Sequence, residues 1–107
     1  MDFVEFMKIS EVKKFIENLD QDRITFDKHF YKRSRERPVD EGMVRKFLSK
    51  PDKLEKIEKG DNERFKLWFN MSRKYSLVLV VEIILSKDLK IISAWNSYRR
   101  WQKKLQK

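Results

Sequence analysis

The stretch YSLVLVVEIIL, residues 75–85, decides the fold that the sequence predicts. Its apolar side chains occupy successive positions rather than alternate ones, which is typical of a strand that is buried on both faces. We therefore expect it to be the central strand of a sheet. The dipeptide Lys87-Asp88 is expected to form a hairpin turn, and LKIISAW, residues 89–95, to return as the partner strand.

A further strand is predicted upstream, because apolar and polar residues alternate there with a period of two. The residues expected on one face are Phe65, Leu67 and Phe69, and those expected on the other are Arg64, Lys66 and Trp68. Leu54 and Ile57 mark a shorter strand before it. Residues 63–95 are thus predicted to form three consecutive antiparallel strands.

Residues at helical spacing predict three helices in the first half of the chain. They are expected over residues 10–19 after the N-cap Ser10, over about 27–36 before Pro38, and between the N-cap Asp40 and Pro51. Asn96 is expected to cap a last helix. This order predicts an α+β fold with a small antiparallel sheet and helices packed on one of its faces. The other face is expected to form a shallow cleft.

The chain has 107 residues, which is enough for a single domain spanning residues 1–107. It carries 26 Lys and Arg residues against 17 Asp and Glu residues, a net charge of +9. The positive excess falls in two segments, with net charges of +5 over residues 23–50 and +6 over residues 86–107. Such a segregated charge distribution favours an anionic partner, RNA above all. A generally basic, solvated surface is the alternative.

The expected location is cytoplasmic, with no membrane partner. The absence of cysteine fits a reducing compartment. The first ten residues carry acids where a signal peptide would carry bases. The longest apolar run is interrupted at Glu82, well short of the ~20 residues that a membrane span needs.

Several chemistries are excluded by residue counts. Glycine occurs only at Gly42 and Gly60, whereas phosphate-binding loops and dinucleotide fingerprints need several glycines close together. One histidine and no cysteine exclude zinc sites of the finger type, and we expect neither a metal nor a cofactor. What remains is metal-independent chemistry on RNA, in which the 2′-hydroxyl attacks the adjacent phosphate with help from a base, an acid and cations.

The sharpest local feature is DKHFYKRSRERP, residues 27–38. It holds the chain's only histidine, His29, among five bases: Lys28, Lys32, Arg33, Arg35 and Arg37. On a helix, His29, Lys32 and Arg33 share one face. This arrangement places a proton-transfer group beside cations suited to a phosphate. A solvent-facing histidine on a basic helix is the alternative.

A second feature is SAWNSYRRWQKK, residues 93–104, in which aromatic residues and bases interleave. Bases of single-stranded RNA stack on aromatic rings such as Trp95 and Tyr98, while cations track the phosphates. The candidate cations here are Arg99, Arg100 and Lys103. The alternative is that the aromatic residues, with Trp101, anchor the last helix in the core.

Arg64 is a third candidate. The alternation places it on the side of its strand opposite Phe65. A lone arginine on a strand is otherwise a solvated edge charge.

Three short motifs follow one another along the chain. The first, H-x-x-x-R-x-x-E-R-x-[IV], is formed by His29, Arg33, Glu36, Arg37 and Val39 and is followed by Pro51-Asp52. The second is formed by Gly60, Glu63 and Arg64, and the third by Ile92, Ser93 and Ala94. In this order they resemble the RelE/BrnT-type superfamily of small toxins, especially an uncharacterised branch of it.

The resemblance covers residues 23–107 and leaves residues 1–22 as an N-terminal helical extension. It implies a RelE/BrnT-like α+β sheet fold, metal-independent ribonuclease chemistry and an antitoxin partner. Members of such a superfamily share a fold more reliably than a mechanism.

The leading hypothesis is a toxin-like, metal-independent endoribonuclease of a toxin–antitoxin pair, with RNA and an acidic antitoxin-like protein as partners. His29 is the expected base or acid, and Arg33, Arg37 and Arg64 are the expected phosphate clamps. The residues expected to bind nucleic acid are Lys28, Lys32, Arg35, Trp95, Tyr98, Arg99, Arg100 and Lys103. Two alternatives stay open: a non-catalytic RNA- or DNA-binding module, and a protein-interaction subunit whose charge serves an acidic partner.

Overall fold

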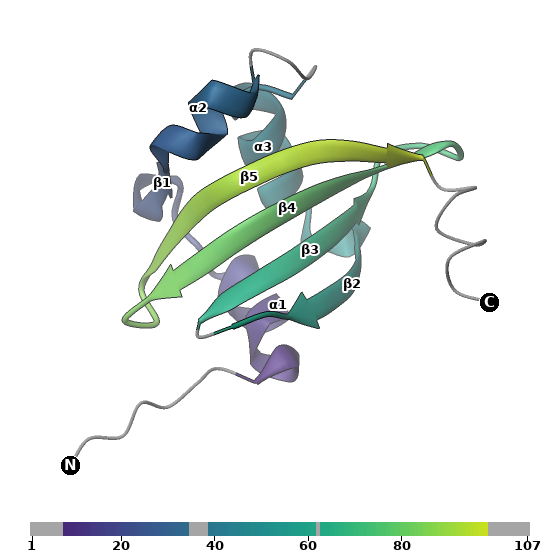
Figure 1. Cartoon of the computed structure of the whole chain (residues 1–107). Helices are drawn as coiled ribbons and strands as arrows, with labels where there is room; N and C mark the ends of the chain where they lie inside the picture. The colour runs from purple at the N-terminus through teal and green to yellow at the C-terminus, as the bar shows by residue number, and fades with distance from the viewer. Residues whose placement is uncertain (1–7, 35–38, 62, 99–107) are drawn as a thin grey trace.

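The computed structural model describes residues 8–34, 39–61 and 63–98 (Figure 1). Its helices and strands are α1 (Ile9–Glu17), β1 (Ile24–Phe26), α2 (Lys28–Ser34), α3 (Glu41–Leu48), β2 (Leu54–Lys59), β3 (Arg64–Asn70), β4 (Tyr75–Ile84) and β5 (Asp88–Tyr98). The predicted α+β class is confirmed. No helix in this part of the chain is long and apolar enough to cross a membrane.

The five strands form one sheet in the order β1-β5-β4-β3-β2. Strands β2 to β5 are antiparallel neighbours, which confirms the predicted strands between residues 63 and 95. The sheet is nevertheless mixed rather than purely antiparallel, because β1 pairs in parallel with β5. A parallel pair needs a long connection, and here the chain from β1 to β5 includes α2, α3 and the other three strands. A strand of three residues carries too little periodicity to be predicted.

Strand β4 lies in the middle of the sheet, as its doubly apolar sequence predicts. On one face its side chains Leu77, Leu79, Val81 and Ile83 are buried in the core. On the other face Val78 is also fully buried. The predicted alternation of β3 is confirmed as well, because its three inward residues, Phe65, Leu67 and Phe69, are inaccessible to solvent.

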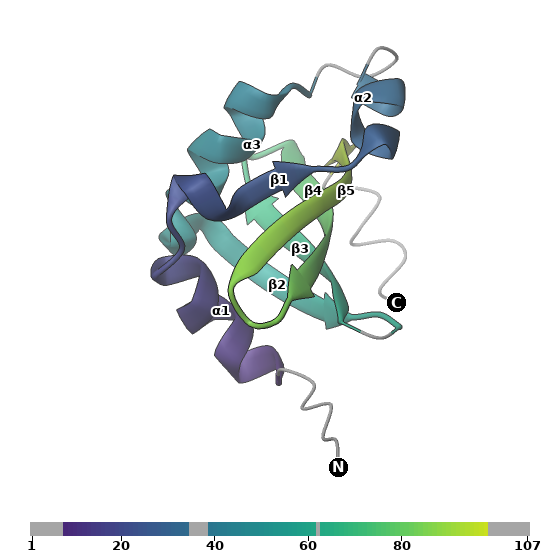
Figure 2. The ribbon, with the colours of Figure 1, turned by 90° about the vertical axis from the view of Figure 1, so that its left-hand side faces the viewer.

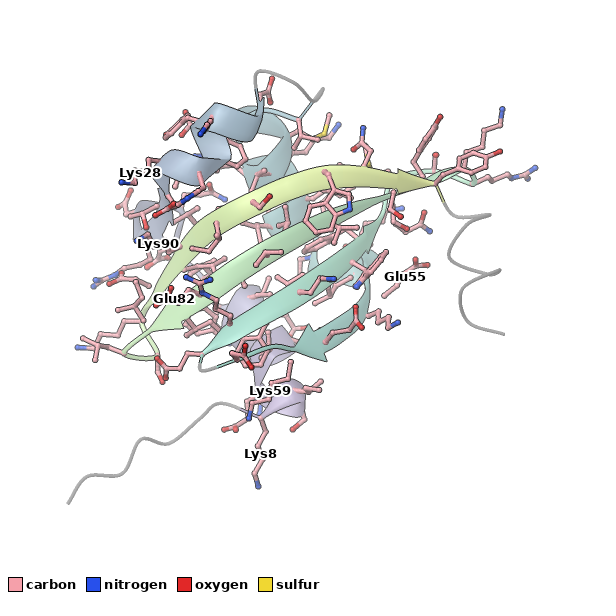
Figure 3. All side chains as sticks on the ribbon, in the orientation of Figure 1. Lys8, Lys28, Glu55, Lys59, Glu82 and Lys90 are labelled. Carbon is pink, nitrogen blue, oxygen red and sulfur yellow. The ribbon has the colours of Figure 1, made fainter. Side chains whose placement is uncertain are left out.

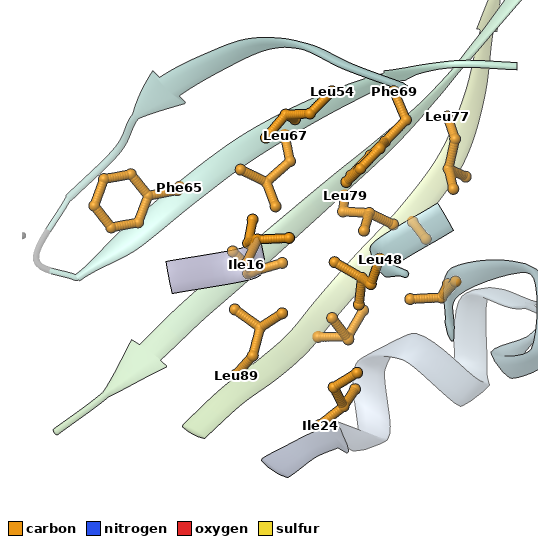
Figure 4. Close-up of a cluster of buried hydrophobic side chains, with 14 of the residues drawn as sticks. Ile16, Ile24, Leu48, Leu54, Phe65, Leu67, Phe69, Leu77, Leu79 and Leu89 are labelled. Carbon is orange, nitrogen blue, oxygen red and sulfur yellow. The ribbon is translucent and has the colours of Figure 1, made fainter. Parts of the chain in front are cut away.

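Helices α1 and α3 cover one face of the sheet (Figures 1 and 2). Val12 and Ile16 of α1 and Val44 and Leu48 of α3 are buried in the same apolar cluster as the inward residues of the strands (Figure 4). Burial of each such side chain contributes roughly 1.5–3 kcal/mol to folding. Helix α2 lies apart from this layer and packs against β5.

The three predicted helices are present, but their ends differ from the prediction. Helix α1 ends at Glu17 rather than at residue 19, and α2 begins at Lys28, so that Asp27 precedes it. Asp40 caps α3, because its Oδ1 accepts a hydrogen bond of 2.9 Å from the backbone N–H of Met43. Ser10, by contrast, lies inside α1 and not at its N-cap. The helix begins one residue earlier, after Lys8, whose backbone N–H donates to the carboxylate of Glu11 at 2.9 Å. The start of the helix is therefore stabilised by the carboxylate of Glu11, at its third position, and not by a serine cap.

The prediction that a C-terminal helix starts at Asn96 is wrong, because residues 96–98 belong to a strand. Strand β5 continues through Tyr98, with Asn96 opposite Leu77 and Tyr98 opposite Tyr75. The rings of Tyr75 and Tyr98 are 5.5 Å apart in an edge-to-face arrangement, which favours continued pairing. The remainder of that helix falls on residues 99–107, outside the described residues.

The β4–β5 hairpin turn also differs from the prediction, because it occupies residues 85–87 and Asp88 already belongs to β5. Leu85 and Ser86 both have positive φ angles, 53° and 56°. The N–H of Lys87 donates to the carbonyl of Ile84 at 3.0 Å and closes the turn. Two successive left-handed residues match the twist of a hairpin, but Asn-Gly normally fills these positions.

The double substitution Leu85→Asn and Ser86→Gly should therefore stabilise the protein. Most L-residues cost about 1–2 kcal/mol in the left-handed region, whereas Asn and Gly enter it easily. Leu85 is 79% exposed, so little packing is lost. We expect the free energy of unfolding, measured in urea, to rise by about 1–2 kcal/mol.

Ser72→Gly is the matched control, because Ser72 lies in the β3–β4 turn and its Oγ accepts hydrogen bonds from the N–H groups of Lys74 and Tyr75. This variant should lose stability. If the double variant at Leu85 and Ser86 is no more stable than the parent protein, the turn carries no conformational strain.

Candidate nucleic-acid interface

The face of the sheet opposite α1 and α3, called here the open face, carries Trp68, Trp95 and most of the charged side chains of the strands (Figure 3). The strand register assigns to it Lys56, Glu58, Arg64, Lys66, Trp68, Val78, Glu82, Lys90, Ser93 and Trp95. Beside β3 it is hollowed by a space of about 590 Å³ that Arg64, Lys66 and Glu82 help to line. Two of the sequence-predicted site residues, Arg64 and Trp95, lie on this face.

Two tryptophans stand on this face on either side of β4. Trp68 of β3 and Trp95 of β5 are both direct cross-strand neighbours of Val78. The ammonium group of Lys66 lies 6.0 Å from the ring centre of Trp68 and 5.7 Å from that of Trp95. Both distances are within the range of a cation–π interaction. One lysine thus sits against two indole rings.

The ring of Trp68 is held in place by its neighbours on β2. Its indole Nε1–H donates to a carboxylate oxygen of Glu58 at 2.7 Å. The ammonium of Lys56 lies 5.6 Å from the same ring centre. A hydrogen bond to a charged acceptor on a paired strand limits rotation of the ring, so Trp68 is oriented before any ligand arrives.

Trp95 reaches the open face because β5 contains a bulge. Val80 pairs with Ser93 and Val81 with Ile91, so Ile92 is an extra residue. Strand side chains alternate between faces, and an extra residue reverses the alternation beyond it. Lys90 before the bulge and Trp95 after it therefore share a face although five positions separate them.

Charged groups form a row across one end of the open face. Arg64 of β3 pairs with Glu82 of β4 at 3.5 Å. Glu82 stands opposite Lys90 of β5, and Lys90 pairs with Asp27 at 3.2 Å. Asp27 in turn contacts His29 at 2.6 Å. The row, hereafter the charge row, joins Arg64 to His29 through groups of alternating sign, and Figure 3 labels two of its members, Lys90 and Glu82.

The carboxylate of Asp27 makes two contacts with His29 at the start of α2. Its Oδ2 accepts a 3.0 Å hydrogen bond from the backbone N–H of His29, which caps the helix, and contacts the imidazole Nδ1 at 2.6 Å. A carboxylate can only accept, so Nδ1 carries the proton and Nε2 of a neutral imidazole is left as the proton acceptor. The side chain of His29 is 64% exposed. His29 is therefore an oriented, accessible proton-transfer group.

The pKa of Asp27 is held well below its ordinary value of 3.8. The backbone N–H of His29 contributes most, followed by the imidazole of His29; the nearby Lys90 ammonium adds to both. Each of these groups favours the ionised carboxylate. Asp27 is therefore ionised throughout the physiological range.

The structure describes the side chains of six of the predicted site residues, and those of the others lie outside the described residues. Lys28, His29 and Lys32 are exposed on α2, Arg64 is exposed on β3, and Trp95 and Tyr98 are partly buried on β5. The backbone of Arg33 belongs to α2, but its side chain is outside the described residues, as are Arg35, Arg37, Arg99, Arg100 and Lys103.

Sequence reasoning missed Asp27, Lys66, Trp68, Glu82 and Lys90 as site residues. The alternation in β3 already placed Lys66 and Trp68 on the same side as Arg64, and that signal was sufficient to nominate them. Asp27 and Lys90 form an ion pair although they are far apart in the sequence, so no local sequence pattern could predict their contact. Among the described residues, no group of three or more His, Cys, Asp or Glu side chains is arranged to hold a metal ion.

The fold and the interface together define a small α+β domain whose open sheet face combines two tryptophans, several cations and an Asp-His pair at its rim. Comparisons with models of protein families, with curated proteins and with solved structures found no match to this chain.

Asp27→Asn tests the charge row through its pH dependence. A group whose pKa is lowered by folding contributes stability above its unfolded pKa, and this contribution is lost as pH falls through the folded pKa. Asparagine keeps the helix cap but removes the charge. We expect the variant to be less stable than the parent protein at pH 6, with the difference shrinking below about pH 4.

Denaturant unfolding at several pH values measures this difference. Asp40→Asn is the control, because Asp40 caps α3 through the same kind of hydrogen bond and is not a member of the charge row. A difference between parent and Asp27→Asn that stays constant down to about pH 3 would show that the charge of Asp27 adds nothing to stability.

Proposed function

We propose that this protein binds single-stranded RNA on the open face and cleaves it without a metal, as a toxin-like endoribonuclease. The observation that carries the proposal is the Asp27–His29 pair at the rim of a cationic, aromatic sheet face. Fixed orientation by a carboxylate is how a histidine is prepared for proton transfer in many hydrolytic sites. The resemblance of the motifs to RelE/BrnT-type toxins points in the same direction.

The reaction follows from the chemistry of RNA. Nε2 of His29 accepts the proton of a 2′-hydroxyl, whose oxygen attacks the adjacent phosphorus while the bond to the 5′ oxygen breaks. The leaving 5′ oxygen takes a proton from a second group or from water. Cations stabilise the charge that develops on the phosphate, and Lys90, paired with Asp27, is the cation of the sheet nearest to His29 along the charge row.

Arg64 serves a neighbouring phosphate in this proposal. It lies two strands from Lys90, a separation of roughly 10 Å at about 4.8 Å per strand. Its pairing with Glu82 keeps the guanidinium oriented across the face. Arg64 then fixes the path of the strand and leaves the scissile phosphate to the groups near His29.

A non-catalytic RNA-binding module is the second candidate. It is favoured by Trp68 and Trp95, because paired aromatic rings among cations suit the binding of unpaired bases whether or not cleavage follows. The same surface serves both functions, so the distinction depends on His29.

His29→Ala should reduce cleavage of a labelled single-stranded RNA by ~10²-fold or more in the presence of a chelator, the scale expected for loss of a general acid or base. Lys32→Ala is the matched control on the same helix, since Lys32 is exposed and carries charge without a proton-transfer role. It should weaken binding and leave the rate at saturating RNA nearly unchanged. Equal cleavage by the His29 variant and the parent, with both folded, would leave the binding module as the better explanation.

A cell that makes such an enzyme needs an inhibitor, and we propose an acidic, antitoxin-like protein that covers the basic face. Complementary charge would speed its association and set its orientation. Induced expression of this chain in a bacterium should slow growth, and His29→Ala should abolish the effect. Co-expression of an acidic protein encoded beside this chain should restore growth. Harmless expression of the folded, unmodified chain would count against the toxin proposal.

A further inference from the structure

Trp68, Trp95 and Lys66 carry an inference that rests on the RNA-binding part of the proposed function and is independent of cleavage. We infer that the two indole rings form a slot for one unpaired nucleobase, which Lys66 occupies in the free protein. When a base enters, the lysine leaves the slot and moves to a phosphate of the same strand.

The spacing of the strands fits one base. Trp68 and Trp95 both pair with Val78, so their backbones are two strand spacings apart, roughly 10 Å. Aromatic atoms in contact lie about 3.5–4.0 Å apart, so a base between two rings needs ring planes separated by roughly 7–8 Å. The Lys66 ammonium lies 6.0 Å from one ring centre and 5.7 Å from the other, so the space shared by the two rings already admits a side chain.

The floor of the slot is apolar. Val78, the cross-strand neighbour of both tryptophans, is fully buried although it points away from the core behind the sheet. A valine offers no hydrogen bonds to a base edge. The slot therefore recognises the flat face common to all bases, and it selects unpaired bases over those already stacked in a duplex.

Lys66 is a weaker occupant than a base. A cation over an exposed aromatic ring is worth about a two- to five-fold preference, whereas a base stacked on one ring is worth about 5- to 150-fold. The backbone of Lys66 stays on β3 between Arg64 and Trp68, so a displaced ammonium remains beside the bound strand. Exchange of the lysine for a base thus yields both a stacking contact and a phosphate contact.

The test measures binding of a short single-stranded DNA that lacks the 2′-hydroxyl and so cannot be cleaved by the proposed chemistry. Trp101→Phe gives the background protein, because Trp68 and Trp95 are then the remaining fluorophores of tryptophan type. The three probes are the single strand, the same sequence as a duplex, and a strand of equal length without bases. The single strand should quench the fluorescence, and the other two should quench it several-fold less at equal occupancy.

Two variants test the rings directly. Trp68→Leu and Trp95→Leu should each weaken binding of the single strand by about 10-fold, while Trp68→Phe keeps most of the affinity. Tyr75→Leu is the matched control, because Tyr75 is 44% exposed and stands at the opposite end of β4 from the charge row. It should change the affinity less than about two-fold. Thermal unfolding of each variant checks that the affinity was measured on folded protein.

Lys66→Met tests the exchange. Methionine has a similar length and no charge, so quenching by the single strand should persist. The slope of log affinity against log salt should become shallower by about 0.7, the value for one phosphate contact on a single strand. An unchanged slope would show that Lys66 does not move to a phosphate and would overturn the exchange.

The slot and the proposed function fail in different ways. If the strand without bases binds as tightly as the normal strand, or if the leucine variants bind normally, the slot is refuted, and cleavage of RNA by the same protein would leave the proposed function standing. If no nucleic acid binds at low salt, both are refuted. Loss of quenching and affinity in both leucine variants, with intact folding, supports the slot whether or not RNA is cleaved.

Discussion

The alternation of side chains along β5 is the constraint on which the interface depends. A strand assigns each residue to one face, so the place where the alternation reverses decides which residues meet. The extra residue Ile92 makes that reversal. It lets Leu89 and Ile91 enter the core on one side of the bulge and Ala94 on the other, while Lys90 and Trp95 remain on the open face. This single bulge therefore decides which residues of β5 are buried in the core and which lie on the open face.

The acidic groups of the open face give its cations fixed positions. Glu58 orients Trp68, Glu82 pairs with Arg64, and Asp27 holds both Lys90 and His29. Exposed pairs of this kind add little to stability, usually less than about 1 kcal/mol each. Their main effect is to limit the rotamers of long side chains, so that the charges of the open face have defined orientations. A strongly basic chain can in this way present ordered charges and not a diffuse positive field.

Local patterns predicted the parts of the fold that local interactions determine. The apolar run of β4, the alternation of β3 and the Asp40 cap each follow from neighbours within a few residues. Strand β1, the bulge at Ile92 and the extension of β5 to Tyr98 depend on pairing between distant segments. The site divides in the same way: His29 and Arg64 were nominated by their surroundings in the sequence, whereas Asp27 acts through Lys90, 63 positions away along the chain. The helical pattern over about 27–36 predicts Asp27 inside the helix, whereas its carboxylate caps the helix from the preceding position.

The parallel pairing of β1 with β5 also orders the assembly of the site in time. Asp27 follows directly after β1, and the ammonium that completes its environment belongs to β5, which comes after β2, β3 and β4 in the chain. During synthesis on the ribosome, α2 emerges long before β5, so His29 has no sheet beside it until the meander of β2 to β5 has formed. Non-local pairings of this kind form late because they close long loops. A growing chain thus lacks the assembled Asp27–Lys90 contact, and the interface comes into existence only when nearly the whole sheet is in place.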